Sequence, residues 1–283
     1  MKFPLNYMKI GFFSLGFIYF LPLDSFAGDL LPSDSLNLGS SHLVKLVIPQ
    51  PASSNRFEYD YIFPLLESNS ERFFIDQKFF VNQKPLLGNS DSYGLINSYG
   101  QSSRIGVRSL FDVGNSFHGV SLGYDSLWNQ GSYFHQFGFA FEYTKQDYQL
   151  VLTAGIPFSR EQFGDAPLTS VNFQISLPTS FAGLAFQPRI YLVSSDSTGS
   201  AVGGQLQLTY SFDSTTSATI ASNFDPITGS SGSLTFQTLF PRRSNTAIPN
   251  LMNPNLLNSF AGAVGNNGSR IIRLADNPDA SGN

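Results

Sequence analysis

A period-two alternation of side-chain character recurs along most of this chain and constrains its fold more than any other feature. The clearest example runs from Gln136 to Tyr143, where Gln, Gly, Ala and Glu alternate with aromatic residues at 137, 139, 141 and 143. Successive side chains of a β-strand point to opposite faces, so each such segment has one apolar face and one polar or small face. The pattern predicts strands, and ten or more segments show it.

The N-terminus has the pattern of a cleaved signal peptide. Lys2 and Lys9 supply positive charge on the N-terminal side of an apolar stretch from Ile10 to Leu21. The small residues in Ser25-Phe26-Ala27 predict cleavage after Ala27. A retained membrane anchor is the alternative. No later apolar run approaches the ~20 residues that a membrane-spanning helix needs, so we expect strands to hold any membrane-bound form.

Composition narrows the class of protein. Charged residues make up 13% of the chain, which has 28 phenylalanines, one tryptophan and no cysteine. About a quarter of the residues of a soluble protein are usually charged. The absence of cysteine excludes disulfides and a lipoprotein anchor, and a net charge of −4 gives no basic surface for nucleic acid.

Twelve candidate strands fill the middle of the chain, most of them about as long as a tilted strand needs to cross a bilayer. We predict an all-β fold, a transmembrane antiparallel up-and-down β-barrel of about 12 strands, after a signal peptide (1–27) and a periplasmic leader (28–41). The barrel is predicted at 42–240, and a linker or tail at 241–283 has a possible short lumenal helix at Asn255–Val264 and a short strand at Arg270–Leu274. The predicted strands are Leu43–Ile48, Arg56–Leu65, Arg72–Val81, Arg104–Phe111, His118–Trp128, Tyr133–Tyr143, Tyr148–Phe158, Ser170–Leu177, Phe186–Val193, Gln205–Phe212, Ala218–Phe224 and Ser233–Phe240.

The lengths of the predicted connections support a membrane barrel. Even-numbered connections are short, whereas the third (Asn82–Ser103) and seventh (Ser159–Thr169) are long and the ninth (Ser194–Gly204) is moderately long. The fifth, Asn129–Ser132, does not follow the trend. Membrane barrels have short periplasmic turns and longer outer loops. A soluble β-sandwich or lipocalin-like barrel is the alternative, and it predicts a charged exterior.

The order of several motifs resembles the inverse autotransporter β-domain, the translocator of intimin and invasin, over residues 55 to about 240. The segments that carry the resemblance are Tyr61-Ile62-Phe63-Pro64, Glu67, Phe74-Ile75-Asp76-Gln77, Gly106-Val107-Arg108, Gly119–Asp125, Gly138–Tyr143, Asp147-Tyr148-Gln149-Leu150, Ile156-Pro157, Leu177-Pro178 and Gly203-Gly204. Thr144 stands where the family has tryptophan, and the Phe74–Gln77 motif has one extra residue before its glutamine.

The resemblance implies a 12-stranded outer-membrane barrel whose following segment threads back through the lumen toward the cell surface. Ser259–Gly262 and Arg270-Ile271-Ile272 are similar to that linker. Neither a peptidoglycan-binding module nor a run of immunoglobulin-like domains accompanies the barrel here, so an adhesin role does not transfer. We expect outer-membrane lipid and the barrel-assembly machinery as partners, no nucleic acid, and an unknown host or surface ligand.

Side-chain alternation also assigns candidate functional positions. Candidate lumen-lining residues are Glu58, Asp60, Arg104, Arg108, Glu142 and Arg189; candidate lipid-facing residues are Phe57, Tyr59, Phe137, Phe139, Phe141 and Tyr143; Phe240 is the candidate terminal strand signal. Tyr143, Tyr148, Phe158, Tyr210, Phe212 and Phe240 are also candidates for aromatic girdles at the membrane interfaces.

The sequence suggests no reaction. His42, His118 and His135 show no catalytic motif, and no metal or cofactor site is expected. The leading hypothesis is a barrel that anchors and displays, or exports, its C-terminal segment. The alternatives are a small outer-membrane channel or porin with a lumenal tail plug and a soluble secreted β-sandwich binding module.

Overall fold

The computed structural model describes residues 40–50, 55–68, 70–83, 96–111, 115–129, 131–146, 148–162, 165–195, 199–213, 215–225, 229–241 and 270–273. Its strands are β1 (Ser41–Gln50), β2 (Asn55–Glu67), β3 (Glu71–Gln83), β4 (Ile96–Phe111), β5 (Ser116–Asn129), β6 (Ser132–Lys145), β7 (Tyr148–Pro157), β8 (Asp165–Pro178), β9 (Leu184–Ser195), β10 (Gly199–Ser211), β11 (Thr216–Asp225), β12 (Gly229–Pro241) and β13 (Arg270–Arg273). The predicted signal peptide, most of the predicted leader and the possible helix at Asn255–Val264 lie outside the described residues.

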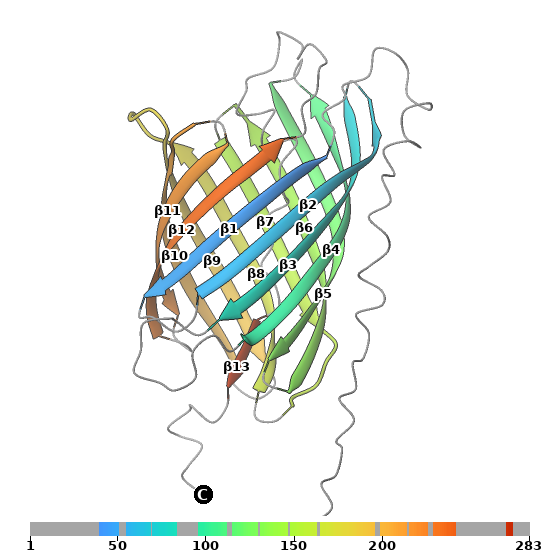
Figure 1. The fold of residues 1–283 in the computed structure, drawn as a ribbon, viewed down its shortest axis with the longest axis vertical. Coiled ribbons are helices and arrows are strands. Elements are labelled where there is room, and N and C mark those ends of the chain that lie inside the picture. Colours follow the sequence, from blue (N-terminus) through green and yellow to red (C-terminus); the bar gives the residue numbers. More distant parts are fainter. Residues whose placement is uncertain are drawn as a thin grey trace, which may run out of the picture.

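Twelve antiparallel strands close into a barrel. Each of β1 to β12 pairs with its neighbours in the chain, and β1 pairs with β12 from Ser41–Pro241 to Gln50–Gly232. Figure 1 shows the strands tilted against the barrel axis, as closure requires. The closed ring confirms the predicted up-and-down barrel of 12 strands and excludes the sandwich alternative.

The two ends of the barrel are defined by the chain direction. At the near end β1 begins and β12 ends, and the connections β2–β3, β4–β5, β6–β7, β8–β9 and β10–β11 lie there. At the far end lie the connections 51–54, 84–95, 130–131, 158–164, 196–198 and 226–228. The β3–β4 and β7–β8 connections, the two longest at the far end, were predicted to be long.

The prediction of a moderately long ninth connection was wrong. β10 begins at Gly199 and pairs with β9 along its whole length, so only 196–198 join the two strands. The composition Gly-Ser-Ala-Val-Gly-Gly suggested a loop, but ladder hydrogen bonds to β9 override the weak strand propensity of glycine and serine. β4 likewise begins at Ile96, eight residues before the predicted start.

Strand β13 adds a short thirteenth strand outside the ring. Arg270–Arg273 pair antiparallel with Leu168–Asp165 of β8, beyond the residues of β8 that pair with β7 and β9. β8 begins at the far end, so β13 lies there too, opposite the end at which β12 (orange) finishes in Figure 1. None of the described residues forms a helix long and apolar enough to cross a membrane.

Candidate functional site: the lumen and the outer wall

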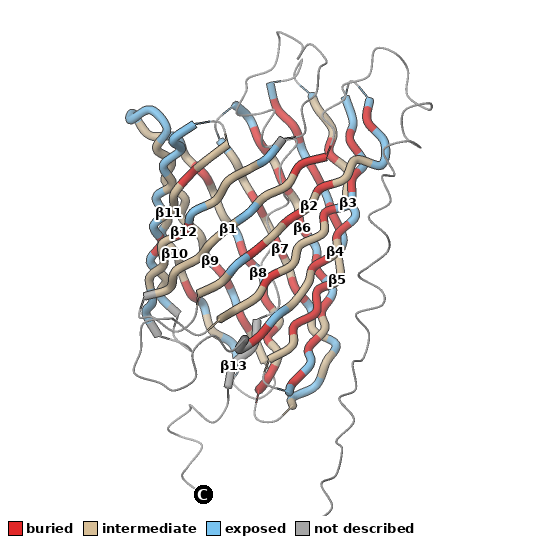
Figure 2. The backbone as a smooth tube through the Cα atoms, viewed as in Figure 1, coloured by how far each residue is buried: buried red, intermediate tan, exposed pale blue. Residues whose placement is uncertain are grey.

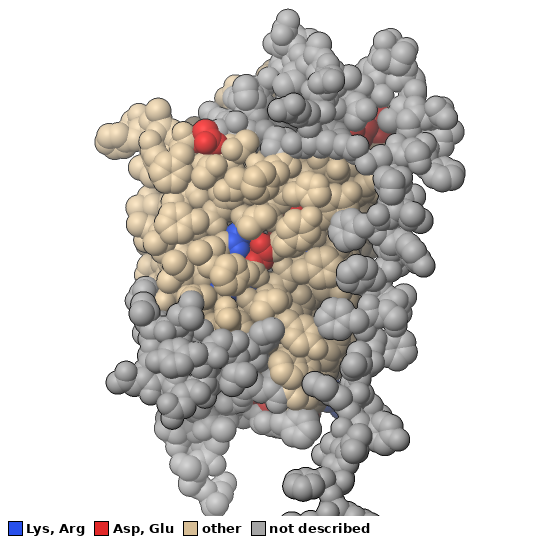
Figure 3. All heavy atoms as spheres, in the orientation of Figure 1, with Lys and Arg blue, Asp and Glu red and all other residues tan. Residues whose placement is uncertain are grey.

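The outer wall of the barrel is apolar. Most outward residues of the strands are hydrophobic and exposed or half-buried; Phe137, Ile156 and Ile190 each expose 61% of their surface. Charged side chains on the outer face of the described strands are confined to the near end, at Glu71 and Lys145. The wall seen in Figure 3 is mostly uncharged, apart from one adjoining blue and red spot near its middle and a red spot near its upper edge. Exposure of such a surface to water is unfavourable, whereas its contact with the hydrocarbon core of a bilayer is favourable.

Aromatic clusters with embedded histidines mark the two rims of this wall. At the near-end rim, His42 contacts Tyr59 and Tyr61, and His118 lies between Phe111 and Tyr143.

Near the far end, Phe158 stacks on His135, and Tyr99 stacks on Trp128. Aromatic residues with a polar group are favoured where hydrocarbon meets headgroups. The two clusters are therefore placed as the girdles of a transmembrane barrel would be.

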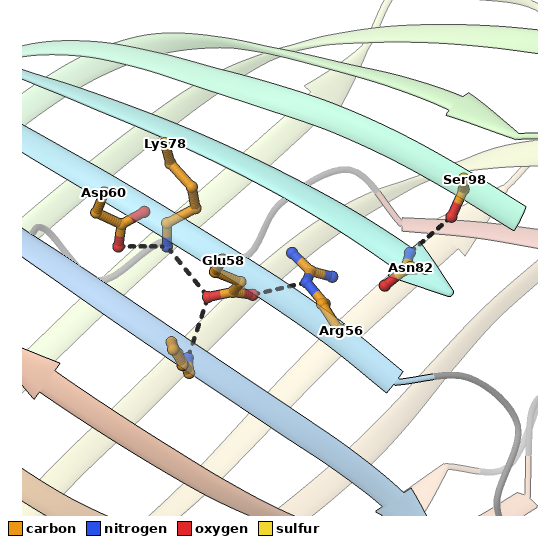
Figure 4. A network of polar contacts seen from close by, with 7 residues as sticks. Arg56, Glu58, Asp60, Lys78, Asn82 and Ser98 are labelled. Atoms are coloured by element: carbon orange, nitrogen blue, oxygen red, sulfur yellow. Dashed lines mark hydrogen bonds and ion pairs between the residues drawn. The ribbon is translucent and has the colours of Figure 1, made fainter. Parts of the chain in front are cut away.

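Charged side chains fill the lumenal wall formed by β1 to β6. Toward the far end, the Glu58 carboxylate forms three ion pairs. Its Oε2 lies 3.3 Å from Lys45 Nζ and 3.9 Å from Lys78 Nζ, and its Oε1 lies 2.6 Å from Arg56 Nε. Lys78 Nζ is also 3.3 Å from Asp60 Oδ2. Figure 4 shows Glu58 between Arg56 and Lys78, so cations from β1, β2 and β3 converge on two carboxylates of β2.

A second network spans the middle of this wall. The Arg104 guanidinium Nη2 lies 3.5 Å from Asp125 Oδ2, and Gln136 Nε2 donates to the same oxygen at 2.6 Å. Arg104 comes from β4, Asp125 from β5 and Gln136 from β6. Arg104 exposes 3% and Asp125 1% of the residue surface, so these two residues and Gln136 join three strands in a buried part of the wall.

Two further ion pairs lie nearer the near end. Arg108 donates from Nε at 2.9 Å and from Nη2 at 2.8 Å to Glu142 Oε2, and Arg72 Nε lies 3.1 Å from Glu67 Oε1. The Arg108 guanidinium also lies over the rings of Phe74 and Phe117. Both arginines are buried. This end of the wall is therefore filled by side chains and leaves little room for water.

The opposite lumenal wall is polar but almost uncharged. The inward side chains of β9 to β12 are mainly amides and hydroxyls, among them Gln187, Gln205, Gln207, Thr209 and Gln237. Arg189 is the inward cation of this half, and its Nη2 donates to Asn172 Oδ1 at 2.6 Å. Figure 2 shows much of β9 to β12 as intermediate or exposed, whereas buried residues are concentrated in β2 to β8. The inward amides and hydroxyls of the neutral wall are therefore more accessible than the buried charged side chains of the opposite wall.

The structure places the predicted positions as follows. Glu58, Asp60, Arg104, Arg108 and Glu142 are buried on the inward face, and Arg189 is half-buried there. Phe57, Phe137 and Phe139 are exposed on the outward face, and Tyr59, Phe141 and Tyr143 are half-buried there. Phe240, next to the end of β12, is outward and 52% exposed.

Several members of the charged networks were not singled out from the sequence. These are Lys45, Arg56, Glu67, Arg72, Lys78 and Asp125. The same period-two rule that assigned Glu58 and Arg104 inward assigns most of them inward. Cross-strand register, which alternation alone does not specify, decides which of these charges meet.

The described residues offer no group of three metal-ligating side chains and no catalytic arrangement around a histidine ring. His42 Nδ1 is 2.7 Å from the Tyr59 hydroxyl, and His135 Nδ1 is hydrogen bonded to the Tyr124 hydroxyl.

Asp213, in the β10–β11 connection, accepts hydrogen bonds from the Thr215 hydroxyl and from the N–H groups of Thr215 and Thr216. These hydrogen bonds lower the pKa of its carboxyl. Asp213 thus caps a turn.

Comparison with known proteins shows the fold. No protein-family model and no curated protein matches the chain. A chain solved in a study of the mechanism behind in-meso crystallization of membrane proteins superposes with a TM-score of 0.62 at 10% identity, over 82% of this chain and 98% of that one.

Two outer-membrane proteins superpose with lower TM-scores. The KdgM porin matches with a TM-score of 0.49 at 9% identity, over 71% of this chain and 99% of that one. Outer membrane phospholipase A from Escherichia coli gives 0.47 at 7% identity, over 74% and 98%.

Proposed function

We propose that this chain is an outer-membrane barrel that anchors its own C-terminal segment and carries it to the far end, as an inverse autotransporter translocator does. One observation carries the proposal. The last strand of the ring, β12, ends at the near end, whereas β13 pairs with β8 at the far end. The chain between Pro241 and Arg270 therefore has to cover the length of the barrel.

The lumen is the favourable route for that crossing. An outside path would expose unpaired backbone N–H and C=O groups to hydrocarbon, at several kcal/mol for each group. An inside path passes the amides and hydroxyls of β9 to β12, which hydrogen bond to a peptide without imposing a charge. Both β12 and β8, where the crossing begins and ends, belong to the sparsely charged half of the ring.

Cysteine labelling on intact cells tests the crossing, and the absence of native cysteine makes the background clean. Ala280→Cys should react with a membrane-impermeant maleimide on intact cells. Arg160→Cys, in the β7–β8 connection at the far end, should react equally. Ser180→Cys, in the β8–β9 connection at the near end, should react only after the outer membrane is permeabilised.

The two connection variants fix the orientation independently of the tail. If Arg160→Cys reacts on intact cells and Ala280→Cys does not, the tail does not reach the cell surface and the proposal is wrong. If Ser180→Cys reacts and Arg160→Cys does not, the barrel is inserted the other way round.

A small channel is the second candidate, and the accessible neutral wall of β9 to β12 is the observation that favours it. A tail that acts as a plug predicts higher single-channel conductance after deletion of 244–283. A displayed tail predicts cleavage of that segment by protease added to intact cells.

The proposal assigns the protein no enzymatic activity. It assigns Phe240 as the terminal aromatic residue that the barrel-assembly machinery recognises.

A further inference from the structure

On β3, β4 and β5 the apolar outer wall is interrupted by a group of polar side chains, the amide patch, which consists of the half-buried Gln77, Gln101 and Ser103 and the buried Ser126. The patch lies on β3, β4 and β5, and its members meet by register: Gln77 is opposite Ser103, and Gln101 is opposite Ser126. Ser103 Oγ donates to Gln77 Oε1 at 2.6 Å. Glutamines of the later strands, such as Gln174, Gln205 and Gln237, point into the lumen instead.

The amide patch begins next to the far-end girdle, where Ser126 is opposite His135, and extends from there into the apolar band. Along the outer face of β4, Gln101 and Ser103 stand between Tyr99, which stacks on Trp128 in the far-end girdle, and Ile105. Along β3, Gln77 stands between Ile75 and Phe79. Gln77 and Ser103 therefore lie in the apolar band, where hydrocarbon surrounds them in the plane of the membrane.

The amides of the patch have unused hydrogen-bonding groups. Within the described part of the chain, the Gln101 side chain makes no hydrogen bond, and Gln77 uses only its Oε1. Gln101 is half-buried, so its amide remains accessible from outside. Polar groups at the lipid face are costly and are favoured where a protein partner satisfies them.

We propose that the outer face of β3 to β5 is the contact between two copies of this chain in the membrane, arranged about a two-fold axis through the amide patch. A primary amide carries both donors and an acceptor, so two glutamines related by a two-fold axis satisfy each other. Phe79 and Ile105 flank the patch and supply the apolar area around it. This inference does not depend on the proposed display of the tail.

A second copy fits this surface better than lipid or an unrelated chain. Acyl chains have neither donors nor acceptors, and the patch has no charged residue to hold an anionic headgroup. A two-fold contact needs only a self-complementary surface, and the paired Gln and Ser groups are such a surface.

Thiol cross-linking in native outer membranes tests the contact. Phe79→Cys leaves every amide in place, because Phe79 is the outward neighbour opposite Gln101. It should yield a cross-linked homodimer with a short bismaleimide. Ile190→Cys, outward and 61% exposed on β9, is the matched control and should stay monomeric.

Adding Gln77→Leu and Gln101→Leu to Phe79→Cys should lower the dimer yield about tenfold, the upper end of what a few membrane hydrogen bonds contribute. Sedimentation of the cysteine-free protein with and without the two leucines gives the same comparison if Phe79→Cys fails to fold. Equal cross-linking from positions 79 and 190, an adduct with a different protein, or a dimer that is insensitive to the leucines would each overturn the proposal.

Discussion

At the scale of single residues, inward glycines make room for the long charged side chains of the lumen. Arg104 lies across two of them: a Cβ at Gly123 would lie 2.5 Å from Arg104 Cγ, and a Cβ at Gly138 would lie 2.5 Å from Arg104 Nη2. Alternation in the sequence placed Gly138 on the polar face, but only the structure shows which guanidinium covers it.

Gly138→Val should therefore displace Arg104 from Asp125 and lower the free energy of unfolding by about 1–3 kcal/mol, as overpacking usually does. The measurement is the temperature at which the folded band of the purified protein disappears in a detergent gel. Gly204→Ala is the matched control, because the nearest atom to its new Cβ would be Arg189 O at 3.8 Å. An unchanged melting temperature for Gly138→Val would contradict the packing account.

The Arg108–Glu142 pair gives a second prediction at this scale. Arg108→Leu leaves the Glu142 carboxylate buried without its cation, and breaking a buried pair in this way costs about 3–5 kcal/mol. Arg108→Leu with Glu142→Leu should be closer to the wild type than Arg108→Leu alone. Urea unfolding in micelles gives all the free energies, and a double variant less stable than either single variant would show that the pair is not the cause.

At the scale of elements, much of the barrel was predictable from the sequence, and the part that was not has a common physical cause. Centres of all twelve strands follow from alternation. The first residues of β4, β8 and β10 were missed because they are Ser-, Gly- or Pro-rich and become strands only through pairing with neighbours. Some charged positions, such as Glu58 and Arg104, were predicted to face the lumen, but their partners were not, because register depends on pairs of strands.

The element that the sequence indicated least strongly is β13, whose pairing with β8 can be tested directly. Adjacent N–H groups of a strand point to opposite sides, so only one of Ile271 and Ile272 donates toward β8. One of the variants Ile271→Pro and Ile272→Pro should therefore release the tail, seen as faster cleavage by protease, and the other should release it less. Identical cleavage of both variants and the wild type would show that the pairing does not hold the tail.

At the scale of the whole molecule, the girdles define how deep the barrel sits in a bilayer. Trp128 is the sole tryptophan and stacks on Tyr99 in the far-end girdle, so its emission should be quenched most by lipids brominated close to the headgroup. In Trp128→Phe with Phe139→Trp, the new tryptophan lies in the apolar band and should be quenched most by deeply brominated lipids. The same quenching profile for both proteins would contradict the assigned position.

The confinement of most lumenal ion pairs to β1 to β6 has a consequence for the order of assembly. Arg72 with Glu67, Arg104 with Asp125 and Arg108 with Glu142 all join strands of the N-terminal half. A curved sheet of these six strands can neutralise its own charges without contacts from the later strands. The C-terminal half then brings few charges that need a partner, so the final closure of β12 onto β1 requires little further removal of water from ions. The first half of the ring is therefore balanced in charge by itself, and the second half adds few charges.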